Sequence, residues 1–540
     1  MKRRNFVISA LGARHSALGL QAGALVRHPP SAERRVPSAE NEVPSAESSV
    51  AELQAGMQAG TYSSRELTEM YLARIESIDR RGPMINSVIE VNPEAIAIAE
   101  SLDRERKAGR VRGPLHGITI LIKDNIDTGD RMQTTAGSLA LEGSIAPKDA
   151  FIVERLRAAG CVLLGKTNLS EWANFRSSHS SSGWSGRGGQ TKNPYVLDRN
   201  TCGSSAGSGA AGSASLATIT IGTETDGSIV CPSSINGLVG IKPTVGLWSR
   251  AGIIPISVTQ DTAGPMCRSV ADAAVLLGPL TGVDPRDPAT SASRGHSETD
   301  YRRFLDQAGL KGARIGVMRK HMGVSAKTEA VYDDAIAALK AAGAVIVDPV
   351  DLADPGPLGA AEWQVLAYEF KAGVEAYLTT VSGNVPHRTL ADLIAFNLAN
   401  RSREMPHFAQ ETFDLAAKMG PLSSPKYRTL LATCRRLART EGLDRRFNQH
   451  RLDAIISVTA GPSWPIDLVN GDRFTGGSST YAAVAGYPNI TVPMGQVSGL
   501  PVGLSFVGRA WSEGRLLQLA YGFEQATKAR FAPSFRATIG

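Results

Sequence analysis

The sequence predicts an α/β protein in which helices cover a layered β-sheet. Helical patterns alternate with short apolar strands at both ends of the chain, as in "AFIVERLRAAGCVLLGKTN". Of the 540 residues, 42% are hydrophobic and 20% are charged, a balance that can bury a large core. The 55 glycines and the alanine-rich stretches are typical of helices packed closely on a sheet.

Residues 1–47 differ from the rest, and we expect them to be a leader and a linker. "MKRRNFVISALGA" has a basic start and then an apolar run, like an export signal, and residues 3–7 resemble a twin-arginine pattern. Arg14 and His15 interrupt that run, so a terminal extension without a targeting role is the alternative. PSAE then recurs at residues 30, 37 and 44, and such short proline-containing copies indicate a linker. Export would place the protein in the periplasm or the medium.

Residues 48–540 are expected to form a single body. Ser63 and Glu66 have the spacing of a capping box, and the apolar residues that follow lie on one helical stripe: Leu67, Met70, Tyr71, Ile75 and Ile78. A second helix follows Asn92-Pro93, and "GPLHGITILIKDN" predicts a short buried strand. Residues 300–450 are mostly helical and are expected to form a lid or side wall. "YAAVAGYPNITVPMGQVSGLPVGLSFVG" returns to helix and strand, and a last helix covers "SEGRLLQLAYGFEQATKA".

Charge, hydropathy and spacing argue against several function classes. The net charge is +7, and the first 50 residues carry +3 of it, with seven Lys or Arg against four Glu. No basic stripe with interleaved aromatic residues is present, so we expect no nucleic-acid partner. No run of apolar residues is long enough to span a membrane. The nine histidines show no metal-ligand spacing and the five cysteines no C-x-x-C, so we expect no metal site, and Cys161 is expected to be a small buried hydrophobe.

Two glycine-rich segments match binding or catalytic motifs only superficially. "GSGAAG" fits G-x-G-x-x-G, but no apolar strand precedes it, so we expect no dinucleotide cofactor. Ser228 lies in "GTETDGSIVCPSS", which is not the G-x-S-x-G of an α/β-hydrolase. No histidine is placed to form a triad with it. Ser228 is therefore either part of a surface turn or a nucleophile with a different base.

A lysine can be that base if it is neutral at the working pH. Lys123 ends the apolar run "GITILIK", where burial would lower its pKa, although a lysine at a strand end is more often exposed. Ser204 lies in "CGSSAGSGAAGSASLATITIGTETDGS", where small residues let backbone segments approach closely. Taken alone, such a serine is commonly a solvent-facing cap.

Lys123, Ser204 and Ser228, in that order, resemble the amidase signature family. The signature region is "CGSSAGSGAAGSASLATITIGTETDGSIVCPSSINGLVGIKPT", with support from "GPLHGITILIKDN", "GKTNLSEWANF" and "GLWSRAGIIPISVTQDTAGPMCRSVADAAVLL". The likeness covers roughly residues 50–530. It implies a central mixed sheet with helices on both faces and a monomer that needs no cofactor.

The resemblance also implies a role for each site residue. Ser228 is the nucleophile, Ser204 is a bridging serine held by a cis peptide bond, and Lys123 is the base. The backbone N–H groups of Thr225, Asp226, Gly227 and Ser228 form the oxyanion hole. The chain departs from the family where Asp226-Gly227 and Ala206-Gly207 stand in place of Gly-Gly.

Several segments are similar to bacterial peptide amidases, including "SEWANFR", "SGWSGRGGQTKNPY" and "ADLIAFN". The expected substrate is a small peptide amide, which would lose ammonia. Trp172, Phe175 and Trp184 are expected to line the approach to Ser228, the alternative being that they are core. Other candidate functions are the glutaminase subunit of an amidotransferase, a general aliphatic or aryl amide hydrolase, and a non-catalytic binding protein. A fatty-acid amide hydrolase fits less well, because no membrane-binding helix is evident.

Overall fold

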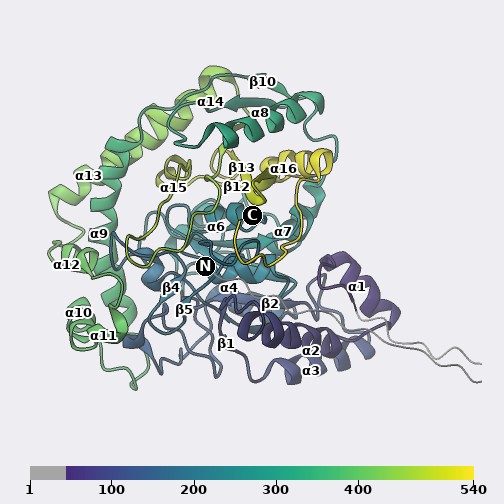
Figure 1. The fold of residues 1–540 in the computed structure, drawn as a ribbon, viewed down its shortest axis with the longest axis vertical. Coiled ribbons are helices and arrows are strands. Elements are labelled where there is room, and N and C mark those ends of the chain that lie inside the picture. The colour runs from purple at the N-terminus through teal and green to yellow at the C-terminus, as the bar shows by residue number, and fades with distance from the viewer. Residues whose placement is uncertain (1–43, 540) are drawn as a thin grey trace, which may run out of the picture. The chain divides into compact units, whose positions relative to one another are not determined.

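Residues 44–539, the part of the chain that the computed structural model describes, are built around one mixed sheet (Figure 1). Its 11 strands follow the order β1-β3-β2-β6-β8-β7-β12-β13-β11-β9-β10. They are β1 Val88–Val91, β2 Thr119–Lys123, β3 Val162–Thr167, β6 Ile219–Glu224, β7 Val239–Lys242, β8 Thr262–Cys267, β9 Arg314–Val317, β10 Val345–Val347, β11 Ala454–Val458, β12 Asn489–Val497 and β13 Leu500–Val507. A separate ribbon pairs β4 (Trp184–Ser185) with β5 (Gly189–Gln190).

Helices flank this sheet, so the predicted α/β class with a central mixed sheet is confirmed. They are α1 Val50–Ala59, α2 Ser64–Arg74, α3 Ala95–Lys107, α4 Phe151–Ala158, α5 Ala206–Ser213, α6 Val230–Ile235, α7 Val270–Leu277, α8 Ala326–Ala341, α9 Gly356–Leu378, α10 Leu390–Ala399, α11 Arg401–Glu404, α12 Glu411–Ala417, α13 Pro425–Arg435, α14 Asp444–His450, α15 Thr480–Ala485 and α16 Glu513–Thr527. In α2 the predicted capping box is present: Ser63 Oγ accepts from the Glu66 N–H, and the Glu66 carboxylate accepts from the Ser63 N–H.

The pairing of β2 and β6 positions the candidate site. β2 is parallel to both of its neighbours, β3 and β6. Parallel neighbours end at the same edge of a sheet, so Lys123, the last residue of β2, lies beside the end of β6 at Glu224. The loop that carries Ser228 starts directly after Glu224. Adjacent parallel strands thus bring together residues that lie far apart in the sequence.

The predicted helical block at residues 300–450 also contributes to the sheet. It contains α8 to α14, but β9 and β10 lie between and beside these helices and form one end of the strand order. The segment "VYDDAIAALKAAGAVIV" lies in this block, and its last three residues form β10, because the chain turns at Gly343 with φ +93°. Helices α12 and α13 each pack against α9 (Figure 1).

The predicted leader lies almost entirely outside the described residues, including the twin-arginine pattern and two of the PSAE copies. The third copy is described, and its Glu47 contacts the body. Glu47 forms an ion pair with Arg530 at 2.6 Å and accepts a hydrogen bond from Ser215 Oγ. Among residues 44–539, no helix is both long and apolar enough to cross a membrane.

Candidate active site

Lys123 is carried into the interior by a strand that is buried at every position. Its Nζ donates to Ser204 Oγ at 2.8 Å and to Thr223 Oγ1 at 2.9 Å. Burial lowers the pKa of Lys123 to about 7, although the carboxylates of Asp261 and Glu224 act in the opposite direction. A large fraction of this lysine is therefore neutral near pH 7 and able to accept a proton.

Ser204 lies just before α5, and the peptide bond between Gly203 and Ser204 is cis, as the family resemblance implies. Its side chain is fully buried. The chain can pass this point only because residue 207 has no side chain: a Cβ there would collide with the backbone oxygens of Ser87 and Asn168. Of the pair Ala206-Gly207, only the second position therefore requires glycine.

Ser228 lies in the loop between β6 and α6, where Gly227 has φ +81°, a conformation that glycine adopts without strain. Ser228 is 9% exposed, and its Oγ has no hydrogen-bond partner among the described residues. No hydrogen bond joins Ser228 Oγ to Ser204 Oγ, but the Ser205 N–H donates to the Ser228 carbonyl at 3.2 Å. The structure thus brings the two serine segments together and leaves the Ser228 hydroxyl free for a substrate.

The loop around Ser228 has four unused hydrogen-bond donors. Within residues 44–539, none of the backbone N–H groups of residues 225–228 has an acceptor. Backbone N–H groups in a buried loop are rarely left without a partner, so an oxygen of water or of a bound substrate is the expected acceptor. An oxyanion hole needs such N–H groups without an internal partner, and this is the role that the resemblance implies for Thr225, Asp226, Gly227 and Ser228.

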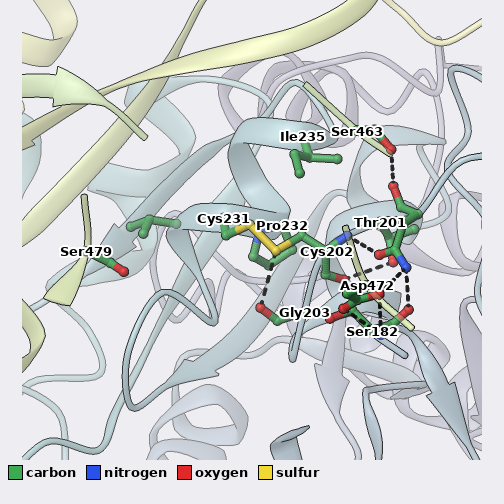
Figure 2. The surroundings of a disulfide bond; sticks show 12 residues. Ser182, Thr201, Cys202, Gly203, Cys231, Pro232, Ile235, Ser463, Asp472 and Ser479 are labelled. Atoms are coloured by element: carbon green, nitrogen blue, oxygen red, sulfur yellow. Dashed lines mark hydrogen bonds between the residues drawn. A yellow bond between two sulfur atoms is a disulfide. The ribbon is translucent and has the colours of Figure 1, made fainter. Parts of the chain in front are cut away.

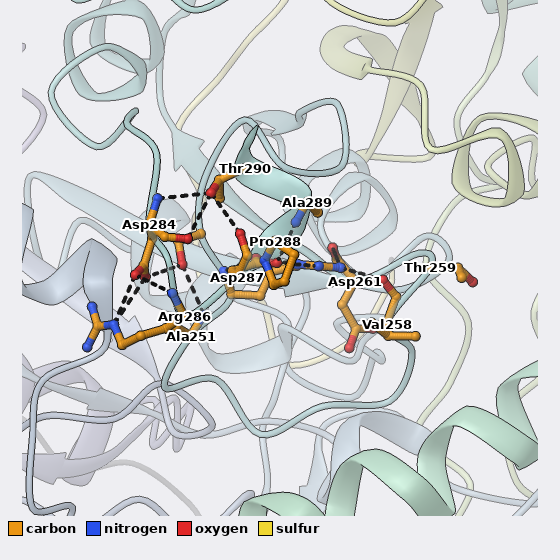
Figure 3. A network of polar contacts seen from close by, with 12 residues as sticks. Ala251, Val258, Thr259, Asp261, Asp284, Arg286, Asp287, Pro288, Ala289 and Thr290 are labelled. Carbon is orange, nitrogen blue, oxygen red and sulfur yellow. Dashed lines mark hydrogen bonds and ion pairs between the residues drawn. The ribbon is translucent and has the colours of Figure 1, made fainter. Parts of the chain in front are cut away.

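A cavity of about 410 Å³ reaches this loop at Thr225, and its lining also includes Asn125 and Thr223, whereas Lys123, Ser204 and Ser228 are not among its lining residues. Its apolar lining includes residues 253–256. Two arginines also line it, but each is paired. Arg250 donates to Asp287, and Arg286 donates to Asp284, within the polar network of Figure 3. Neither cation is free to receive a carboxylate from a substrate.

Trp172 and Phe175 are buried, each contacting the ring of Phe370 on α9. Trp172 also lines a small cavity next to the first one. Trp184 stacks edge-on against Phe408 and does not line either cavity. The structure therefore places Trp172 in the wall of a small cavity and Trp184 in a separate contact, and the part of all three aromatic residues in substrate binding stays a prediction.

Several polar residues near Ser228 were not identified from the sequence. Thr223 and Asn125 share one hydrogen bond beside Lys123, with Asn125 Nδ2 donating to Thr223 Oγ1 at 3.0 Å. Asp261 accepts from Thr225 Oγ1 at 2.7 Å. The only signal was that Asp261 lies in "SVTQDTAGPM", a segment that resembles the family. In the described part of the chain, no three His, Cys, Asp or Glu side chains gather into a metal site.

A disulfide joins the two serine segments, and the sequence did not predict it (Figure 2). Cys202 precedes Ser204 by two residues, and Cys231 follows Ser228 by three, with 6.1 Å between the two cysteine Cα atoms. The spacing along the chain gave no indication of a pair. Cys161 is buried, as expected, and burial raises the pKa of its thiol.

Opening this disulfide is expected to lower both stability and activity. It closes a loop with a sequence separation of 29, which corresponds to about 3–4 kcal/mol in the chain-entropy treatment of the unfolded state. Thermal unfolding and initial rates, each with and without dithiothreitol, measure the two effects. The matched control is Cys202→Ser/Cys231→Ser, which should not respond to the reductant. Unchanged melting of wild-type protein whose thiols are shown to be free by mass spectrometry would contradict the prediction.

Comparison with known proteins places the chain in a family. The sequence model of the family described as Amidase matches residues 66–517. A probable amidase of Arabidopsis thaliana is 42% identical over 484 residues, which cover 88% of this chain and 89% of the relative. A putative amidase of Schizosaccharomyces pombe is 35% identical over 513 residues, covering 90% and 86%. A glutamyl-tRNA(Gln) amidotransferase component of Acinetobacter baumannii is 34% identical over 490 residues, covering 88% and 95%.

Solved structures give the same result. The native peptide amidase of Stenotrophomonas maltophilia is 53% identical, with a TM-score of 0.88, and the match covers 91% of this chain and 99% of that chain. An amidase family protein from Bacillus anthracis is 36% identical with a TM-score of 0.82, covering 90% and 92%. The chain therefore belongs to the amidase signature family and is an amide hydrolase.

Proposed function

We propose that the chain removes ammonia from the C-terminal amide of peptides, with Ser228 as nucleophile, Ser204 as bridge and Lys123 as base. The observation that carries this proposal is the hydrogen bond from Lys123 to Ser204. Lys123 is buried, which lowers its pKa, and the loop that holds Ser228 has four N–H groups without a partner among the described residues. The likeness to a peptide amidase at 53% identity supports the choice of substrate.

The geometry supports a two-step reaction. Ser228 Oγ attacks the amide carbon, while its proton passes to Ser204 and the proton of Ser204 passes to neutral Lys123. The carbonyl oxygen becomes an oxyanion that accepts hydrogen bonds from the free N–H groups, each worth on the order of 10²–10³ in rate. Lys123 returns the proton through Ser204 to the leaving nitrogen, and ammonia departs. Water then attacks the acyl-enzyme by the same proton path and releases the peptide acid.

The amidotransferase alternative is less well supported by the charges of the cavity. Free glutamine carries an α-carboxylate, which a glutaminase has to bind. The cations that line the cavity, Arg250 and Arg286, are already paired with Asp287 and with Asp284 and Glu154. A peptide amide has no carboxylate at its reacting end and needs no such partner.

Mass spectrometry of products is expected to separate the candidate substrates. A peptide amide should become the corresponding peptide acid plus ammonia, with every internal bond intact and with no effect of EDTA. Longer peptide amides should react faster than amino-acid amides, because remote contacts contribute to transition-state binding. The same peptide as a free acid is the control. Fragments, or turnover of glutamine or of a short aliphatic amide in preference to peptide amides, would contradict the proposal.

We also propose that the protein acts outside the cytoplasm, as a monomer. The basic and apolar start of the sequence supports export, and so does the Cys202–Cys231 disulfide, because such bonds persist mainly in oxidising compartments. The mature protein from its native host should lack the first few dozen residues, as shown by N-terminal sequencing. Recovery of intact Met1 in the cytosolic fraction would refute export.

A further inference from the structure

Asp226 occupies a position at which the family often has glycine, and its side chain is engaged on both oxygens. Oδ1 accepts from Ser479 Oγ at 2.5 Å, and Oδ2 accepts from Thr480 Oγ1 at 2.7 Å. Ser479 and Thr480 form the start of α15, 253 and 254 residues further along the chain. We call these two hydrogen bonds the Asp226 clamp. Two short contacts thus tie the loop before Ser228 to a segment far outside the signature region.

We infer that the Asp226 carboxylate is a positioning group for the oxyanion hole, acting through the Asp226 clamp; this inference rests on the proposed function. The backbone on either side of the Asp226 Cα carries two of the four free N–H groups, those of Asp226 and Gly227. Gly227 at φ +81° has no side chain to limit its own rotation. Fixing the neighbouring side chain therefore restrains the direction of both donors before the substrate binds.

The rest of the loop is held from its other side. Thr225 Oγ1 donates to Asp261, and the Thr225 carbonyl accepts from Gln260 Nε2 at 3.4 Å. Gln260 Nε2 also donates to Glu362 on α9 at 2.7 Å. Glu224 closes the base of the loop by accepting from the N–H groups of residues 229 and 230. After Asp226, the Gly227 carbonyl accepts from the Cys231 N–H at 2.8 Å and the Ser228 carbonyl accepts from the Ser205 N–H at 3.2 Å. Without the Asp226 clamp, residue 226 itself would have no hydrogen bond within residues 44–539.

The charge of Asp226 makes the two hydroxyl donors necessary. A buried carboxylate without hydrogen-bond partners is costly, and the two hydroxyls supply one donor to each of its oxygens. Burial raises the pKa of Asp226, while the Ser479 and Thr480 hydroxyls and the Lys242 ammonium oppose that rise by stabilising its ionised form. A side chain that only filled space at position 226 would not require these hydrogen-bond donors and this nearby cation.

Two variants that remove the Asp226 clamp test the inference, and the first of them leaves the loop sequence unchanged. The variant Ser479→Ala/Thr480→Val deletes both donors, and Asp226→Gly deletes the acceptor. We expect each to lose about 10- to 100-fold in kcat while KM changes by less than about threefold, because the contact acts on the transition state. Asp226→Asn can still accept one bond and donate the other, so it should stay within about threefold of wild type in kcat.

A second readout does not depend on knowing the substrate. A fluorophosphonate probe phosphonylates a reactive serine: an Oγ–P bond forms at Ser228, fluoride leaves, and the hydroxyl proton passes toward Lys123. The phosphoryl oxygen occupies the oxyanion hole, so the labelling rate should fall in the Asp226 clamp variants by a factor similar to that in kcat. If wild-type protein labels at Ser228 but hydrolyses no peptide amide, the proposed substrate fails while the inference is still tested.

Three outcomes would overturn the inference. A lowered melting temperature with unchanged kcat and labelling rate would show that the Asp226 clamp only stabilises the fold. A raised KM for substrates with a free α-amino group, with unchanged kcat and labelling rate, would show that Asp226 binds substrate instead. Loss of kcat in Asp226→Asn as severe as in Asp226→Gly would show that the charge, and not the pair of hydrogen bonds, is what matters.

Discussion

Ser228→Ala is expected to reduce amide hydrolysis by on the order of 10⁶, to the limit of detection, because no acyl-enzyme can form without the hydroxyl. The protein should stay folded, since Ser228 Oγ makes no hydrogen bond to any other residue of the described range 44–539 that the change would remove. We expect its melting temperature to remain within about 3 °C of wild type. Initial rates, thermal unfolding and intact-mass analysis of an acid-quenched reaction measure these effects.

The chain offers a matched control for this variant on the helix that follows the loop. Ser233 lies on α6, is fully buried, and its Oγ also has no hydrogen-bond partner among the described residues. Ser233→Ala therefore removes an equivalent hydroxyl a few residues from the nucleophile and should keep wild-type turnover. Residual turnover in Ser228→Ala, or an acyl or phosphonyl adduct on any other residue of wild-type protein, would contradict the assignment of the nucleophile.

Those parts of the fold that depend on local sequence could be predicted. The capping box at Ser63 and the buried strand ending at Lys123 are both set by residues within a few positions of each other. The order of the signature motifs also indicated the mixed sheet, because the family resemblance extends over nearly the whole body. Burial of Lys123 followed from its strand, and its lowered pKa follows from that burial.

What the sequence did not predict depends on contacts between distant segments. The pairing of Cys202 with Cys231 requires that the loop before α5 and the start of α6 pack together, which no spacing rule reveals. The partners of Asp226 are separated from it by more than 250 residues. The edge-to-face contact of Trp184 with Phe408 also joins residues that are far apart in the sequence, and the expected part of Trp184 in substrate binding stays a prediction.

Lys123→Arg and Lys123→Ala are expected to abolish turnover nearly as completely as loss of the nucleophile. Arginine remains protonated at any pH that the fold tolerates, and alanine offers no base. In wild-type protein, activity should rise with pH through about 7, because only neutral Lys123 accepts the proton. The pH dependence of kcat/KM measures this limb, and near-normal turnover in Lys123→Arg would rule out a lysine base.

The protonation of Lys123 should also affect the free energy of unfolding, which gives an independent test of its lowered pKa. The pKa of Lys123 is about 7 in the folded chain against 10.5 for the free side chain, so between these values the unfolded state binds the additional proton. The unfolding free energy of wild type should therefore rise with pH across this window, relative to Lys123→Met, and the difference should level off above it. Denaturant unfolding of both proteins at a series of pH values measures this. A wild-type stability that runs parallel to that of the methionine variant would mean that Lys123 stays charged in its buried site, and the lysine could then not act as the base.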